Sequence, residues 1–255
     1  MSAPLLEARE ITVRFDGVTA LDRVSFEVEA GELLGLIGPN GAGKTTLLKA
    51  VTGTVKPQAG RVRLSGRDIG ALPVHQRARL GLGLSHQLVR PFRSMTPLEN
   101  VVLAAGGKRT RRPLLALLQR QRGAETARAR ELLELVGIAE AAQSEVSSLP
   151  LGYLKRLEVA RALALGPKLL LLDEPLAGLN HVEAGRFADT IAALNAQGLT
   201  IILIEHNLSE VLRVSSRLLV LDNGRQIAVG EPRAVMAEAA VRAAYMGEEQ
   251  DHAAA

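Results

Sequence analysis

Hydrophobic and polar positions along the chain predict short strands that alternate with helices. Alternating apolar and polar residues, or short runs of apolar residues alone, are typical of β-strands. The strands predicted in this way cover residues 5–13, 24–29, 33–37, 61–64, 81–85, 169–172, 200–205, 218–222 and 225–229. Segments with helical spacing predict helices over residues 44–51, 182–196, 208–214 and 232–245, and over most of 97–164. This alternation favours an α/β fold with a mostly parallel sheet.

We expect a single domain with an α-helical insert. The α/β core is expected over residues 1–87 and 161–230, the helical insert over 88–160 and a C-terminal helical tail over 231–255. No internal repeat is visible.

Composition narrows the classes of function. With 255 residues, of which 47% are hydrophobic and 23% charged, the chain can bury a sizeable core. The absence of cysteine excludes disulfides, cysteine-ligated zinc, iron–sulfur clusters and a thiol nucleophile, and agrees with a cytoplasmic location. We see neither a signal peptide nor about 20 consecutive apolar residues, so a soluble chain is expected. The net charge of +4 leaves nucleic acid, a membrane surface or an anionic ligand as partners.

A glycine-rich segment after the strand at 33–37 fits the phosphate-loop pattern G-x-x-x-x-G-K-[ST]. It consists of Gly38, Pro39, Asn40, Gly41, Ala42, Gly43, Lys44, Thr45 and Thr46. Its glycines let backbone N–H groups turn inward, and the following helix directs the positive end of its dipole at an anion. Lys44 would supply a charge for the β- and γ-phosphates, and the Thr45 hydroxyl would bind Mg²⁺. A turn that only caps a helix is the alternative, but the strand before and the helix after favour a P-loop nucleotide-binding core.

Two acidic residues end the apolar strand at 169–172. Asp173 and Glu174 should therefore lie at the carboxyl edge of the sheet, where ligands bind in open α/β folds. Asp173 is the candidate to hold Mg²⁺ through water, and Glu174 is the candidate to polarise the water that attacks the γ-phosphate. An acid that merely caps a helix is the alternative.

With these motifs, essentially the whole chain resembles the ATP-binding subunits of ATP-binding-cassette transporters. The resemblance implies an N-terminal antiparallel β-subdomain, ATP and Mg²⁺ as ligands, and ATP hydrolysis coupled to transport. It also implies roles for further residues, in the order in which the family carries them. Gln87 would join Mg²⁺ to the attacking water, Phe15 would stack on adenine, and His206 would contact the γ-phosphate. Leu179 and Asn180 would form the loop exchanged across a nucleotide-bound dimer, the D-loop.

The family's signature, normally Leu-Ser-Gly-Gly-Gln, departs from its usual form here. The matching residues are Leu149, Pro150, Leu151, Gly152 and Tyr153. In the family the serine contacts ATP held by the opposite subunit, whereas Pro150 has neither a hydroxyl nor an N–H to donate. We hypothesise that this signature is weakened. If the partner is a different protein, the two shared ATP sites would then be unequal. Tolerated subgroup variation is the alternative.

Several segments resemble the branched-chain (hydrophobic) amino-acid uptake subgroup. They are residues 83–101, 177–180, 203–207, 224–230 and 244–248. The subgroup implies transmembrane permease subunits, a second ATP-binding subunit, and a periplasmic or lipid-anchored binding protein as partners. It also implies a peripheral position on the cytoplasmic face of a bacterial inner membrane. The lipopolysaccharide-export ATPases, which work as homodimers with an intact signature, are the alternative within the family.

Two classes of protein outside transport compete with this interpretation, namely a soluble ATPase of DNA repair or translation and a nucleotide-binding regulator. The interval from Lys44 to Asp173 is too short for a long coiled-coil insert, one cassette is present where translation factors have two, and no zinc cysteines occur. Glu174 and His206 suit hydrolysis and disfavour a regulator.

Two segments are candidates for contact with a membrane or a membrane protein. Phe92, Met95 and Thr96 would line a groove for a permease helix, or else belong to the local core. Residues 101–130 carry eight basic residues and one acidic residue, Glu125, a local excess larger than that of the whole chain. The basic residues are Lys108, Arg109, Arg111, Arg112, Arg120, Arg122, Arg128 and Arg130. They predict either an amphipathic stretch near anionic headgroups or an acidic partner, or a solvated helix. In either case nucleic acid is not required as a partner.

Overall fold

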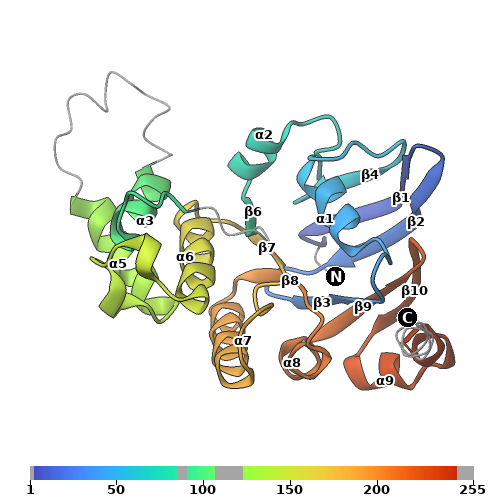
Figure 1. The fold of residues 1–255 in the computed structure, drawn as a ribbon. Helices are drawn as coiled ribbons and strands as arrows, with labels where there is room; N and C mark the ends of the chain where they lie inside the picture. The colour runs from blue at the N-terminus through green and yellow to red at the C-terminus, as the bar shows by residue number, and fades with distance from the viewer. Residues whose placement is uncertain (1–2, 86–90, 107–122, 246–255) are drawn as a thin grey trace.

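Two β-sheets and a set of helices make up the fold (Figure 1). The computed structural model describes residues 3–85, 91–106 and 123–245. The predicted α/β class, with a mostly parallel sheet and an N-terminal antiparallel sheet, is confirmed. No helix in these ranges is long and apolar enough to cross a membrane.

The central sheet has six strands in the order β10-β9-β3-β8-β7-β6. The strands are β3 (Leu33–Ile37), β6 (Leu82–Ser85), β7 (Leu169–Asp173), β8 (Thr200–Ile204), β9 (Arg217–Asp222) and β10 (Arg225–Gly230). All neighbouring pairs are parallel except β9 and β10. The turn between β9 and β10 contains Asn223 and Gly224, both with positive φ, as a tight hairpin requires.

The second sheet is antiparallel and has the order β2-β1-β4-β5. Its strands are β1 (Leu6–Phe15), β2 (Val18–Val28), β4 (Ala59–Leu64) and β5 (Arg67–Asp68). The first two strands form one long hairpin, so β2 begins six residues earlier than the alternation at 24–29 predicts.

Helices cover the central sheet on both faces (Figure 1). Helix α1 (Lys44–Thr52) lies between the two sheets, and α7 (His181–Ala196) and α8 (Leu208–Val214) lie on the opposite face. Helices α3 (Pro97–Ala105), α5 (Gly123–Leu135) and α6 (Leu151–Ala164) form a group away from the antiparallel sheet. Helices α2 (Val74–Arg79) and α9 (Pro232–Ala237) also lie in the described residues, and residues 239–245 are helical as well.

The central strands divide their side chains between two hydrophobic clusters. Leu33 and Ile37 of β3 pack with the helices of the α6–α8 side, whereas Leu34 and Leu36 pack with α1 and the antiparallel sheet. Every residue of β3 and β7 is buried, as their continuous apolar sequence predicts for strands covered on both faces.

Two predicted helical segments differ in detail from the observed ones, and one observed helix is not predicted. The stretch 97–164 is divided by two 3₁₀ turns, Ala139–Ala141 and Val146–Ser148. The tail helix expected over 232–245 is broken at Glu238, whose backbone is extended. Helix α2 is not predicted by the sequence, because its inward residue is charged and gives no apolar period. That residue, Arg77, is buried and donates to the carbonyls of Ala50 and Val51 at the end of α1.

Candidate functional site

The sheet brings three of the predicted motifs to one edge. Strands β3, β8, β7 and β6 are parallel neighbours in this order, with Leu36 beside Ile204, Ile204 beside Asp173, and Leu172 beside Ser85. The segments that follow the carboxyl ends of β3, β8 and β7 therefore lie next to each other. They are the phosphate loop after β3, Glu205 and His206 after β8, and Glu174 after β7. Gln87 lies outside the described residues.

The phosphate loop is a tight turn that only glycine can make at its first position. Gly38 has φ +145°, and a Cβ at this position would lie 2.0 Å from the Leu221 carbonyl oxygen on β9. Helix α1 begins at Lys44, directly after Gly43, and carries no acidic residue in its first turn. The N-terminal N–H groups of α1 thus form an electropositive end suited to a phosphate. Thr45 and Thr46 lie half-buried in this first turn.

Lys44 is folded into the loop that it follows. Its side chain is only 6% exposed, and Nζ donates hydrogen bonds to the carbonyl oxygens of Gly38 (2.5 Å) and Pro39 (2.8 Å). A buried ammonium held by backbone carbonyls is a charge pre-positioned for an anionic ligand. The remaining loop residues range from buried Ala42 to exposed Asn40.

Glu174 and His206 meet although they are far apart in sequence. Asp173, the last residue of β7, is buried. Glu174 follows it with a left-handed backbone, φ +52°, and its Oε1 lies 2.7 Å from His206 Nε2. The carboxyl group and the imidazole therefore form one polar pair next to the phosphate loop. Such a pair can polarise a water molecule and bind a phosphate oxygen.

Phe15 lies at the end of the β1–β2 hairpin. Its side chain is 46% exposed, although it is a large apolar residue, and Val18 opposite to it is also exposed. The same hairpin reaches the phosphate loop, because a Cβ at Gly43 would lie 2.7 Å from the carbonyl oxygen of Ala20 on β2. An exposed ring on this strand is available to stack on a flat ligand.

The signature segment begins helix α6 and contacts the D-loop of the same chain. Pro150 is the N-cap residue and Leu151 is the first residue of the helix. A Cβ at Gly178 would lie 3.0 Å from Leu151 Cδ2, and one at Gly152 would lie 3.5 Å from Leu179 Cδ2. The half-buried Leu149 precedes the cap. The two segments predicted to face a second subunit are thus neighbours on one surface.

Tyr153 and Asn180 already have partners within the chain. The Tyr153 hydroxyl donates to Glu140 Oε1 at 2.6 Å, which lowers the pKa of Glu140 and raises that of the tyrosine. Asn180 Oδ1 accepts from the Glu183 N–H at 2.9 Å and caps helix α7. Within the chain, Tyr153 joins the first turn of α6 to Glu140, and Asn180 stabilises the start of α7.

Comparison with known proteins decides the family. The family described as "ABC transporter" matches residues 21–177, which is more than half of the chain. The chain belongs to the ABC transporter family. The high-affinity branched-chain amino acid transport ATP-binding protein LivG of Salmonella typhimurium is 39% identical over 97% of this chain and all of its own length. The lipopolysaccharide export system ATP-binding protein LptB of Acidithiobacillus ferridurans is 34% identical over 96% of this chain and 98% of its own.

A solved structure agrees with this assignment. The crystal structure of the ADP conformation of MJ1267, an ATP-binding cassette of an ABC transporter, superimposes with a TM-score of 0.84. It is 31% identical, over 96% of this chain and all of that one. The predictions of a nucleotide-binding ATPase and of a transporter subunit are confirmed at this level. The roles of individual residues and the domain boundaries stay predictions.

Two charged residues of this cassette that sequence reasoning missed lie behind the Glu174–His206 pair. Lys155 of α6 is 7% exposed, and its Nζ donates to the Glu174 carbonyl oxygen at 2.8 Å. Glu205 is 4% exposed and accepts a hydrogen bond from the Leu176 N–H. The sequence offers only a weak signal for these two residues. Lys155 is a charged residue within the helical pattern of α6, and Glu205 directly follows the apolar strand β8. Charged groups are buried only when they have partners, so a charged residue at such a position indicates a specific contact.

Glu205 is expected to make the stability of this cassette pH-dependent. Burial raises the pKa of Glu205 from 4.5 to about 7, against the opposing effects of the Leu176 and His206 N–H groups and of Lys155. The charge of Glu174 acts in the same direction as burial. The folded protein therefore holds a proton that the unfolded chain releases, and this stabilisation is full below about pH 4.5 and lost as pH rises through about 7. At about 1.4 kcal/mol per pKa unit, the loss amounts to about 3 kcal/mol.

Denaturant unfolding at about pH 5 and about pH 8 measures this effect. The unfolding free energy of Glu205→Gln should fall by less between the two pH values than that of the wild type. Glu238→Gln, which changes an exposed carboxyl group, is the control and should keep the wild-type pH dependence. Equal slopes for all three proteins would contradict the prediction.

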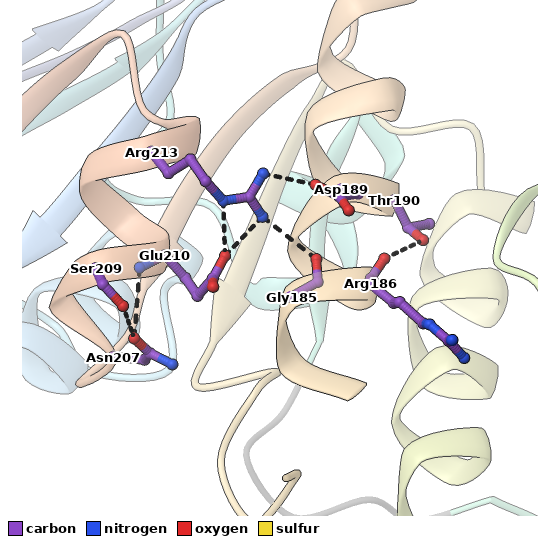
Figure 2. A network of polar contacts seen from close by, with 8 residues as sticks. All are labelled: Gly185, Arg186, Asp189, Thr190, Asn207, Ser209, Glu210 and Arg213. Atoms are coloured by element: carbon purple, nitrogen blue, oxygen red, sulfur yellow. Dashed lines mark hydrogen bonds and ion pairs between the residues drawn. The ribbon is translucent and has the colours of Figure 1, made fainter. Parts of the chain in front are cut away.

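A polar network fixes helix α8, which begins two residues after His206 (Figure 2). Arg213 of α8 binds Glu210 Oε2 at 2.6 Å and also reaches across to α7, where it binds Asp189 Oδ1 at 2.6 Å. Asn207 caps α8 by accepting from the Glu210 N–H. The loop that carries His206 is thereby anchored to α7, which the D-loop precedes.

The predicted membrane-facing residues are only partly described. Phe92 is 48% exposed, so it does not belong to the core, and Arg161 lies over its ring at 5.4 Å. Met95 is half-buried, and Thr96 caps α3 through a hydrogen bond from the Glu99 N–H. Most of the basic stretch lies outside the described residues, at 107–122. Glu125 on α5 is buried, whereas Arg128 and Arg130 are exposed.

Proposed function

We propose that this chain is the ATP-hydrolysing subunit of a transporter that takes up branched-chain amino acids or related small solutes. The observation that carries the proposal is the full-length match to LivG at 39% identity. The residues of the ATP site cannot identify the solute, because they act on ATP and not on the transported molecule. Selectivity for the solute resides in the partner chains.

The phosphate loop binds and orients ATP in the proposed mechanism. Backbone N–H groups of Gly38 and of residues 40–46, together with the Lys44 ammonium, hold the β- and γ-phosphates, while Phe15 stacks on the adenine. The Thr45 hydroxyl and the Asp173 carboxylate, with Gln87, are hard oxygen ligands that fit Mg²⁺. A bound Mg²⁺ would neutralise charge that develops on the phosphate oxygens.

Glu174 and His206 act on the reacting atoms. The Glu174 carboxylate accepts a hydrogen bond from the attacking water and so increases its nucleophilicity toward the γ-phosphorus. His206, held at 2.7 Å from that carboxylate, donates to a γ-phosphate oxygen and fixes the geometry of attack. ATP closes two subunits face to face, and hydrolysis reopens them, which drives the membrane partner.

We further propose that the second ATP-binding subunit is a different protein. Pro150 offers no donor to ATP bound across the interface, and Tyr153 is engaged with Glu140 of its own chain. The ATP site completed by this signature would then be the weaker of two. Permease subunits and an external binding protein complete the assembly, with this chain on the cytoplasmic face of the membrane.

Uptake of radiolabelled leucine by cells with and without this chain tests the proposal. Deletion should abolish saturable leucine uptake, the wild-type chain should restore it, and the Glu174→Gln variant should not. Normal leucine uptake in the deletion strain, together with lipopolysaccharide retained in the inner membrane, would instead support a role in lipopolysaccharide export, like that of LptB.

A further inference from the structure

The turn that follows β7 is held from two sides by the buried side chains of Lys155 and Glu205. Lys155 donates from helix α6 to the carbonyl oxygen of Glu174 at 2.8 Å. Glu205, in the segment after β8, accepts from the N–H of Leu176, two residues further along the turn. The Glu174 N–H continues the sheet by donating to the Ile204 carbonyl oxygen at 2.9 Å. Helix α6 and the end of β8 thus determine the path of the main chain on both sides of Glu174.

Glu174 needs such support because of its backbone conformation. Its φ of +52° lies in the left-handed region, which costs a non-glycine residue about 1–2 kcal/mol. A residue stays in this region only when the surrounding structure holds it there. The conformation has a consequence at the site, since it places Glu174 Oε1 at 2.7 Å from His206 Nε2. Rotation of this peptide group would move the carboxylate away from the histidine.

Lys155 is costly for the fold if its role is packing alone. An apolar side chain of similar length would fill the same space without desolvation of an ammonium group. Burial indeed lowers the pKa of Lys155, against the attraction of Glu205 and Glu174. What the lysine contributes, and an apolar residue could not, is the hydrogen bond to the Glu174 carbonyl. That bond also connects Glu174 to helix α6, which begins with the signature residue Leu151 one turn earlier.

We propose that Lys155 is a positioning residue for ATP hydrolysis, which holds the peptide of Glu174 so that the carboxylate points at the reacting centre only when helix α6 is in place. The proposal rests on the proposed catalytic role of Glu174. It assigns to the signature helix a direct hydrogen bond to this chain's own catalytic segment, in addition to its predicted contact with ATP of the opposite subunit.

Steady-state ATP hydrolysis by the assembled membrane complex tests the proposal. Lys155→Met should lower kcat by roughly 10–100-fold, the cost of misplacing a reacting group by about 1 Å, and leave KM for ATP unchanged. Lys155→Arg retains a charged donor and should keep most of the wild-type kcat. Thermal unfolding of each complex measures stability in parallel.

A double variant separates positioning from charge balance. Lys155→Met with Glu205→Gln removes both buried charges, so it should regain the stability that Lys155→Met loses, yet kcat should stay low. Recovery of kcat in the double variant would overturn the proposal, since Lys155 would then only balance Glu205. A normal kcat in Lys155→Met, or failure of both methionine variants to fold, would also overturn it.

The complex with Glu174→Gln distinguishes the positioning role of Lys155 from the catalytic role of Glu174. Loss of hydrolysis in Glu174→Gln with normal hydrolysis in Lys155→Met would remove only the positioning role. Wild-type hydrolysis in Glu174→Gln would remove the catalytic role of Glu174 itself.

Discussion

Glu174→Gln is expected to slow ATP hydrolysis at the site built on this chain's phosphate loop by about 10²–10⁴-fold, the usual contribution of a general base. Glutamine has nearly the same shape, but its amide does not accept a proton from the attacking water. It also replaces the charged partner of His206, which lies 2.7 Å from the carboxylate. Binding of ATP should persist, because the phosphate loop is unchanged. The variant should therefore accumulate the closed, ATP-bound pair of subunits.

Phosphate release and retention of labelled ATP by the assembled complex check this result. Glu134→Gln makes the same chemical change at an exposed position on α5 and is the matched control, with wild-type turnover expected. Full ATPase activity in Glu174→Gln would show that the ATP site built on the phosphate loop of this chain does not contribute to hydrolysis. Turnover would then take place at the second ATP site of the subunit pair.

Lys44→Met is expected to impair both nucleotide binding and hydrolysis, by about 10²–10³-fold in turnover, as for loss of one donor to developing charge. Methionine has a similar length but carries no charge for the phosphates. The substitution also removes the hydrogen bonds from Nζ to the carbonyl oxygens of Gly38 and Pro39, at 2.5 and 2.8 Å. Loss of these charged hydrogen bonds should lower the unfolding free energy by roughly 1.5–3 kcal/mol.

Lys49 offers a matched control on the same helix. Its side chain is exposed in the last turn of α1, so Lys49→Met should change the unfolding free energy by less than about 0.5 kcal/mol and leave nucleotide affinity intact. Fluorescent-nucleotide titration and denaturant unfolding of both variants make the comparison. Equal nucleotide affinity in Lys44→Met and Lys49→Met would refute the role assigned to Lys44.

Elements with strong apolar patterns are predicted from the sequence nearly to the residue. The pattern predicts β3 at 33–37 and β7 at 169–172, and both strands are fully buried. Both strands lie in the middle of a parallel sheet and have no exposed face, so their continuous run of apolar residues indicates a buried strand. Helix α2 escapes prediction for the opposite reason, because Arg77 takes the place of an apolar core residue there.

The residues of the candidate site also differ in how far they can be predicted from the sequence. The phosphate loop is local, so its residues and the reason for each can be inferred from consecutive positions, as at Gly38. Glu174 and His206 can each be inferred separately, whereas their 2.7 Å contact requires β7 and β8 to be neighbours. The contacts of Lys155 and Glu205 could not be predicted, since the partners of both side chains are backbone groups on other elements.

The family, the phosphate loop, the buried parallel strands and the candidate acids can be inferred from the amino-acid sequence, because each depends on residues that are close along the chain. Which polar groups contact each other is known only from the packed fold. It joined the signature helix to Glu174 through Lys155, placed Leu151 against Gly178, and turned Tyr153 to Glu140 of its own chain. Such contacts depend on the packing of α6 against the end of β7 and its neighbours. A pattern of apolar and polar positions specifies which face of a helix is buried, but it does not specify which group that face will contact.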